Sequence, residues 1–146
     1  MKKATTIAVD IAQTVLEIAV SLRPGQVSAR HRLQRSEVLT FFAQQPAATV
    51  VLEACGSASY WAREIESFGH HAELLPPQHV RRYRSGNKTD RADAKALLEA
   101  FRNEEIRPVP PKTAAQQTLT ALHRLRSAWI GTRSATSAMP GLPGAQ

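Results

Sequence analysis

Two carboxylates stand three residues apart just before an apolar, helix-periodic run. Asp90 and Asp93 share a helix face with Leu97 and Phe101, because positions i, i+3 and i+7 lie on one side of a helix. This stripe places two acids where the helix meets the core, and burying like charges is costly unless a cation lies between them. A divalent metal is the usual solution. The alternative is an ordinary helix start, capped by Thr89 or Asp90.

Two further acids fall at the ends of predicted strands. Asp10 lies within the apolar strand 4–11, on the side opposite Ile7 and Val9. Glu53 follows the continuous apolar run 48–52, which is typical of a central strand covered on both faces. Functional groups gather at the carboxyl ends of such strands. The alternative for both acids is a polar residue where a strand opens into a turn.

Basic residues dominate the chain and cluster upstream of the paired acids. The 146 residues carry a formal net charge of +7 and a pI near 10.3, which favours a polyanionic partner such as nucleic acid. The candidates for phosphate contact, with one aromatic ring that could stack on a base, are Arg81, Arg82, Tyr83, Arg84, Lys88 and Arg91. The alternative is a solvated run of charge.

The single cysteine and the hydropathy limit the class of protein. Cys55 alone can form neither an internal disulfide nor a cysteine-based zinc site, and it fits a reducing compartment. No apolar run approaches the roughly 18 residues that span a membrane. The basic N-terminus precedes an apolar stretch broken by Asp10, so it does not resemble a signal peptide. We expect a cytoplasmic bacterial protein without a membrane partner.

The remaining elements are those that must position the acids. Strands over 4–11, 15–22 and 27–33, joined by tight turns, predict an antiparallel meander. A helix capped by Ser36 ends near Gln45. A helix capped by Ser57 or Ser59 buries Tyr60 or Trp61 together with Ile65 and Phe68, and ends at Gly69. A short strand over 71–75 precedes Pro76-Pro77.

The C-terminal part of the sequence predicts separate segments after the first domain. We expect a first domain over residues 1–107, a proline-rich linker over 108–113 and a helix over 114–133. That helix could pair with another chain through its apolar residues at helical spacing. These residues are Leu119, Leu122, Leu125, Trp129 and Ile130. Residues 134–146 are predicted to be a disordered tail, because they are small, rich in Gly and Pro, and without periodicity.

The order of the elements predicts an α/β fold of the ribonuclease-H-like class. Three antiparallel strands, a helix, a central strand and then alternating helices and a strand place Asp10 in the first strand and Glu53 at the end of the fourth. Asp90 and Asp93 fall on a later helix. Four carboxylates from these elements could hold one or two magnesium ions. Two ions roughly 3.5–4 Å apart would stabilise both oxygens exchanged in phosphoryl transfer.

Several motifs together resemble the DEDD transposases of the insertion-sequence 110 type. They are Val9-Asp10, the strings over residues 52–57 and 60–62, Pro76-Pro77, and the Lys-Thr-Asp-x-x-Asp-Ala string within 87–95. The resemblance implies a RuvC-like mixed sheet flanked by helices, in which Asp10, Glu53, Asp90 and Asp93 are the catalytic acids and bind Mg²⁺, with Mn²⁺ as an alternative. It also implies a DNA recombinase for transposition of a mobile element, guided by a structured RNA and assembled as a homo-oligomer through the C-terminal helix.

The chain departs from this family towards its end. The family's C-terminal domain supplies a nucleophilic serine, whereas here the resemblance stops near Arg133. We therefore expect a truncated or frameshifted chain that lacks the serine domain and is incomplete as a transposase. Nothing around Ser134 or Ser137 indicates an activated nucleophile.

Two other functions remain as alternatives. A non-catalytic nucleic-acid-binding fragment would share the basic surface without needing a metal. An actin-like ATPase or sugar kinase is less well supported, although residues 9–14 resemble a first phosphate loop. Such loops need glycine where Ala12 stands, and the seven glycines of the chain do not cluster suitably.

Overall fold

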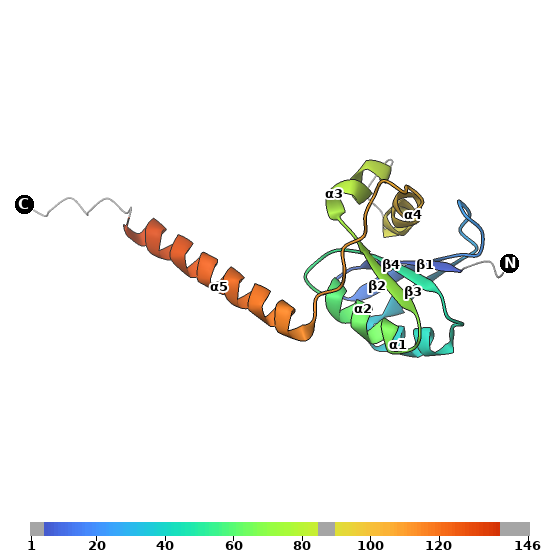
Figure 1. The fold of residues 1–146 in the computed structure, drawn as a ribbon, viewed down its shortest axis with the longest axis horizontal. Helices are drawn as coiled ribbons and strands as arrows, with labels where there is room; N and C mark the ends of the chain where they lie inside the picture. Colours follow the sequence, from blue (N-terminus) through green and yellow to red (C-terminus); the bar gives the residue numbers. More distant parts are fainter. Residues whose placement is uncertain (1–4, 85–89, 138–146) are drawn as a thin grey trace, which may run out of the picture. The chain divides into compact units, whose positions relative to one another are not determined.

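The computed structural model describes residues 5–84 and 90–137, and the chain divides into a unit over 1–111 and a unit over 112–146. The first unit is built on a five-stranded sheet in the order β3-β2-β1-β4-β5. Its strands are β1 (Thr6–Ile11), β2 (Val15–Ser21), β3 (Ala29–Gln34), β4 (Thr49–Glu53) and β5 (His71–Leu75). Neighbouring strands of the β1–β3 meander are antiparallel, whereas β4 pairs parallel with β1 and with β5. The predicted ribonuclease-H-like mixed sheet is therefore confirmed (Figure 1).

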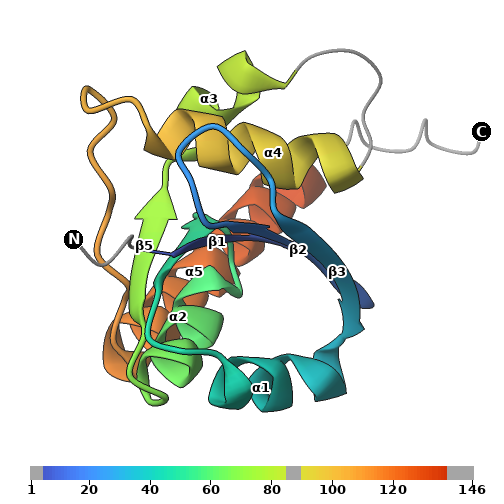
Figure 2. The ribbon, with the colours of Figure 1, turned by 90° about the vertical axis from the view of Figure 1, so that its right-hand side faces the viewer.

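Helices cover both faces of this sheet. Figure 2 shows α1 (Arg35–Gln44) and α2 (Ala58–Glu66) on one side and α4 (Asp90–Phe101) on the other. Side chains alternate along each strand. Val9 and Leu52 therefore pack in the cluster that contains α1 and α2, whereas Ala8 and Val51 pack in the cluster that contains Leu97 of α4. The helical turns α3 (Pro77–Val80) and η1 (Arg81–Tyr83) lead from β5 towards α4.

Small side chains bring α4 close to the sheet. Ala8 and Ala19 on the strands, and Ala96 and Ala100 on the helix, are all buried in the same cluster. Alanine gives a helix backbone room to approach, and it is also the best intrinsic helix former. This close approach fixes where the first turn of α4 meets the carboxyl ends of β1 and β4.

The strands β1 and β3 each begin two residues later than predicted, and two helix boundaries differ from the prediction for local reasons. The helix α1 begins at Arg35 because the backbone N–H of Gln34 donates to the Glu37 carboxylate at 2.7 Å. Ser36 is therefore not the capping residue. The helix α2 ends at Glu66, so Phe68 lies beyond the helix and is 43% exposed instead of buried. Trp61 is the aromatic residue that α2 buries, at 4% exposure.

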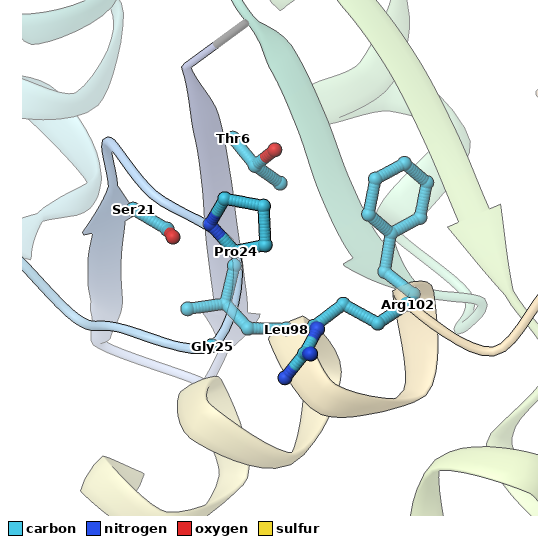
Figure 3. A pocket seen from close by; sticks show the side chains of 7 residues that line it. Thr6, Ser21, Pro24, Gly25, Leu98 and Arg102 are labelled. Atoms are coloured by element: carbon cyan, nitrogen blue, oxygen red, sulfur yellow. The ribbon is translucent and has the colours of Figure 1, made fainter. Parts of the chain in front are cut away.

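The turn between β2 and β3 lies against the C-terminal end of α4. Gly25 in this turn has φ +78°, and an added Cβ there would lie 2.7 Å from Nη1 of Arg102. Figure 3 shows the Arg102 side chain beside Gly25 and Pro24. A small cavity of about 150 Å³ separates the turn from the helix. The residues lining it are Thr6, Ser21, Pro24, Gly25, Leu98, Phe101 and Arg102.

The second unit contains α5 (Ala114–Ser137). This helix runs four residues beyond its predicted end, so residues 134–137 are helical and not part of a disordered tail. The reason is that no proline or glycine interrupts the chain between Gly131 and Pro140. The rest of the predicted tail lies outside the described residues. No helix in the described part of the chain is long and apolar enough to cross a membrane.

Candidate metal and nucleic-acid site

Asp10 is the penultimate residue of β1 and Glu53 the last residue of β4, its parallel neighbour. The register of β1 and β4 pairs Val9 with Leu52, so the next position on each strand holds an acid. Ala8 and Val51, two residues earlier, are buried in the cluster under α4. Because side chains two apart share a face, Asp10 and Glu53 point to the α4 side of the sheet. Strands pair about 4.8 Å apart, so these carboxylates start from adjacent backbone positions. Both residues are half-buried.

The third carboxylate comes from the helix above them. Asp93 lies in the first turn of α4 and is 5% exposed. An acid in this turn interacts favourably with the helix dipole. The following residues, Ala94 and Leu97, are buried against the sheet, which holds this turn of the helix down on it. Of the predicted stripe, the side chains of Asp93 and Leu97 are buried and that of Phe101 is half-buried, whereas that of Asp90 lies outside the described residues.

A single arginine joins two of these acids. Arg84 follows η1 and places Nη2 2.6 Å from Oε2 of Glu53 and Nε 2.8 Å from Oδ1 of Asp93. The side chains of Arg84, Glu53 and Asp93 are 26%, 21% and 7% exposed, so water screens these charges little. The guanidinium therefore supplies the positive charge that two adjacent buried carboxylates require.

The two contacts of Arg84 differ in kind. The contact to Glu53 is a hydrogen bond as well as an ion pair. Nε of Arg84 and Oδ1 of Asp93 are both buried, yet within the described part of the chain neither atom has a hydrogen-bond partner. At 2.8 Å they attract as charges although the N–H is not directed at the oxygen. Among the described residues, Oδ1 of Asp93 is therefore a buried acceptor whose hydrogen-bonding capacity is unused.

This donor set fits a hard divalent cation. Carboxylate oxygens are the ligands that Mg²⁺ and Mn²⁺ prefer, and Oδ1 of Asp93 is a buried oxygen to which no described residue donates a hydrogen bond. Among the residues whose side chains are described, however, no three His, Cys, Asp or Glu residues lie close enough together to hold one ion. The side chain of Asp90, the fourth predicted ligand, lies outside the described residues, as does that of Arg91. A four-acid site therefore stays a prediction.

The predicted nucleic-acid residues fall in different surroundings. Arg81 and Arg82 are exposed on η1. Tyr83 is half-buried, packs against the cluster under α4, and its hydroxyl accepts a hydrogen bond from Nδ2 of Asn103 at 2.9 Å. Arg84 contacts the carboxylates described above. Lys88 lies outside the described residues. Phosphate or base contacts by any of these residues stay a prediction.

One acid near the site did not emerge from the sequence. Glu17 on β2 lies directly opposite Asp10 and is 9% exposed. Its carboxylate is paired with Nε of Arg32 on β3 at 3.5 Å. The signal was available, because strands over 6–11 and 15–21 joined by three residues fix a hairpin register that places Glu17 opposite Asp10.

Solved structures share this fold. The chain is similar to Thermus thermophilus RuvC with a TM-score of 0.52 and 11% identity, over 72% of this chain and 99% of that chain. It is likewise similar to T. thermophilus RuvC in complex with a Holliday junction substrate, with a TM-score of 0.53 and 12% identity, over 73% and 99% of the two chains. The fold is therefore that of a RuvC-like domain of the ribonuclease-H-like class.

Sequence relatives narrow this class to one family. The model of the DEDD transposases of the insertion-sequence 110 type, described as "Transposase", matches residues 7–139. The chain belongs to this family, which excludes the actin-like ATPase or kinase as its class. It is 42% identical over 129 residues to a "Probable family 20 transposase" of Pseudomonas aeruginosa, covering 88% of this chain and 38% of the relative. It is 36% identical over 135 residues to the "Transposase for insertion sequence element IS1111A" of Coxiella burnetii, covering 92% and 37%.

The chain therefore spans less than two fifths of the length of these two relatives. Both matches cover most of the 146 residues, and the range matched by the family model includes β4, β5 and α4. The resemblance expected from the motifs around Asp10, Glu53 and Asp93 is confirmed as family membership.

Proposed function

We propose that this chain is the metal-binding part of a transposase that breaks and rejoins DNA at an insertion sequence. Asp10, Glu53, Asp90 and Asp93 are its metal ligands and its catalytic acids. One or two Mg²⁺ ions are the proposed cofactor. Because the relatives are longer than this chain, the complete transposition reaction is proposed for the full-length family member and not for these 146 residues alone.

One observation carries this proposal. Two carboxylates leave adjacent parallel strands on the same face of the sheet, and the helix packed on that face adds a buried third. Two of the three share one cation, Arg84, which indicates a local demand for positive charge. A divalent ion held by these oxygens would stabilise the attacking and leaving oxygens of a phosphoryl transfer. The carboxylates themselves would hold the ion in place and could accept a proton from the attacking group.

Metal titration tests the proposed ligands. We expect calorimetry to detect Mg²⁺ and Mn²⁺ binding by the wild type, and binding weakened at least about 10-fold in Asp93→Asn and Asp90→Asn, because each loses an anionic ligand. Glu104→Gln is the matched control, since it removes an exposed acid just beyond α4. Absence of metal binding by the wild type, or equal binding by Asp93→Asn, would contradict the metal site.

DNA is the proposed nucleic-acid partner, together with a structured guide RNA. The formal net charge of +7 supports a polyanionic partner. Arg81 and Arg82 are exposed and lie shortly before Arg84 in the chain. The solved RuvC with a Holliday junction substrate supports branched DNA as a probe. Each phosphate contact contributes a salt-dependence slope of about −0.9 on duplex DNA.

Fluorescence anisotropy on a labelled four-way DNA junction tests this partner. We expect the double variant Arg81→Gln, Arg82→Gln to bind more weakly and to lower the salt slope by about 2. Arg102→Gln, which removes one exposed arginine at the far end of α4, should leave the slope unchanged. The affinity for a labelled structured RNA is measured in parallel with that for a single-stranded RNA of random sequence. Weaker binding of the structured RNA than of the single-stranded RNA would contradict the proposed guide RNA.

A non-catalytic nucleic-acid-binding module is the second candidate. The observation that favours it is Arg84, because an arginine that contacts both Glu53 and Asp93 offsets part of their negative charge without a metal. This module would bind nucleic acid equally well in EDTA and in Mg²⁺. Metal-dependent binding that is lost in Asp93→Asn would exclude it.

A further inference from the structure

The Arg84 guanidinium lies on the same oxygens that the proposed metal would use. It contacts Oε2 of Glu53 and Oδ1 of Asp93, which come from a strand end and from a helix first turn. We propose that Arg84 is an internal counter-cation that the divalent metal displaces. This inference rests on the proposed metal site, and it assigns that site a resident competitor for its ligands.

A metal bound to Oδ1 of Asp93 and the Arg84 guanidinium on that oxygen exclude one another. Mg²⁺ binds oxygen at about 2.0–2.1 Å, and Mn²⁺ prefers similar ligands. Nε of Arg84 is 2.8 Å from Oδ1 of Asp93, so a metal bound to the same lone pairs would lie within a few ångströms of the guanidinium charge. Like charges at such separations in a poorly screened site repel strongly. Metal binding through Oδ1 of Asp93 therefore requires Arg84 to leave.

Burial explains why a resident cation is needed. The side chain of Asp93 is 7% exposed and that of Glu53 is 21% exposed. Two carboxylates held this close together out of water destabilise the fold unless a positive charge accompanies them. Arg84 provides that charge from within the chain, so the strand end and the helix first turn stay together before a metal arrives.

The contact to Asp93 is suited to exchange. The N–H of Nε is not aligned with Oδ1, so this part of the interaction lacks a full hydrogen bond. A metal ion has no N–H direction to satisfy and gains the whole acceptor capacity of that oxygen. Arginine, moreover, has a planar fork that also matches a phosphate. Once displaced, Arg84 can turn to the nucleic-acid backbone, which reconciles its predicted phosphate contact with its observed ion pairs.

Calorimetry with Mn²⁺ and with Mg²⁺ tests the exchange on the full 146-residue chain. We expect Arg84→Gln to bind the metal about 5-fold or more tighter than the wild type, because the competitor is gone. Arg84→Lys should fall between the two, since one ammonium cannot span both carboxylates as a fork does. Arg102→Gln removes an arginine that is paired with a single surface acid, and it should bind as the wild type does.

Thermal unfolding provides a second readout that does not depend on activity. Arg84→Gln should unfold at a lower temperature than the wild type in EDTA, and saturating Mn²⁺ should shrink that deficit, because ligand binding to the native state stabilises it. Wild-type metal binding combined with unchanged or weaker binding by Arg84→Gln, or with an equal deficit in EDTA and Mn²⁺, would overturn the exchange and leave the metal site standing. Absence of metal binding by the wild type and by Arg84→Gln alike would overturn both.

Discussion

Asp10 on β1 lies directly opposite Glu17 on β2, so two acids form a cross-strand pair on the α4 side of the sheet. Like charges at such positions destabilise a sheet. Arg32, the register partner of Glu17 on β3, is placed to offset this repulsion, because its Nε lies 3.5 Å from the Glu17 carboxylate. The three strands of the meander therefore carry acid, acid and base side by side.

The first prediction concerns this row. We expect Arg32→Gln to lower the free energy of unfolding by roughly 0.5–1 kcal/mol at low salt, since the Asp10–Glu17 repulsion is then less compensated. The loss should shrink in about 1 M salt, where the Debye length is near 3 Å. Urea denaturation at both salt concentrations measures it.

A double-mutant cycle provides the control for this row. Glu17→Gln in the Arg32→Gln background removes the repulsion and should recover much of the lost stability. Additive effects of the two substitutions would show that Arg32 does not act through Glu17.

The second prediction concerns the turn at Gly25. Its φ of +78° suits glycine, and an added Cβ would press on the Arg102 guanidinium. We expect Gly25→Ala to lower the free energy of unfolding by about 1–2 kcal/mol. Urea denaturation of the variant against the wild type measures the loss.

Gly69→Ala is the matched control for that turn. Its φ is +87°, but nothing lies within 4 Å of an added Cβ, so it reports the backbone strain alone. Arg102→Ala in the Gly25→Ala background should remove any excess that comes from the steric contact. If Gly25→Ala lowers the free energy of unfolding no more than Gly69→Ala does, the Arg102 side chain moves aside freely.

The third prediction concerns His70, a buried residue directly before β5. Its Nδ1 accepts from the Ala48 amide at 3.2 Å, and its Nε2 lies 2.9 Å from the Phe42 carbonyl oxygen, so it ties the end of α1 to the start of β4. We expect His70→Phe to lower the free energy of unfolding by about 1–3 kcal/mol, because the buried Ala48 N–H loses its acceptor, whereas the Phe42 carbonyl keeps the Gln45 N–H as a donor at 3.1 Å. Chemical denaturation measures the loss.

The neighbouring histidine is the control for His70. The side chain of His71 is 70% exposed and contacts Glu73 at the surface. His71→Phe should therefore change the stability by less than about 0.5 kcal/mol. A similar loss for both variants would indicate a general intolerance of this segment instead of a specific bridge.

The fourth prediction concerns assembly through α5. Its exposed apolar side chains, Leu119, Leu122, Leu125, Trp129 and Ile130, occupy one side of the helix, and a second copy of this chain is their proposed partner. We expect Leu122→Glu to reduce the mass measured by light scattering to that of a monomer. Ser127→Glu on the opposite side should leave the mass unchanged. A monomeric wild type at high micromolar concentration would contradict the assembly.

The sequence predicted the strands and their roles well because hydrophobic alternation and turn residues are local signals. The strand over 71–75 was predicted to the residue. Element ends were less accurate, since the start of α1 depends on a Gln34–Glu37 hydrogen bond that competes with the Ser36 cap. The same limit explains the wrong prediction that Phe68 is buried. Phe68 follows Ile65 at helical spacing, but the helix ends at Glu66.

The candidate site was predicted in part for a related reason. Spacing placed Asp10, Glu53 and Asp93 on elements that meet, because strand alternation and helical periodicity both follow from the sequence. The position of Arg84 could not be derived in this way, since a guanidinium at the end of a short helical turn can face water or the acids with equal ease. Only the path of the chain after η1 brings it onto Glu53 and Asp93.

The outer strands of the sheet are also protected against unwanted pairing. The Val109 amide donates to the Leu74 carbonyl at 2.8 Å, so the proline-rich segment covers part of the free side of β5. At the other border, β3 carries exposed Arg30 and Arg32. Exposed strand edges are templates for aggregation, and charge, proline and a covering segment all suppress it. We therefore expect both outer strands of this sheet to resist edge-to-edge pairing between copies of the chain.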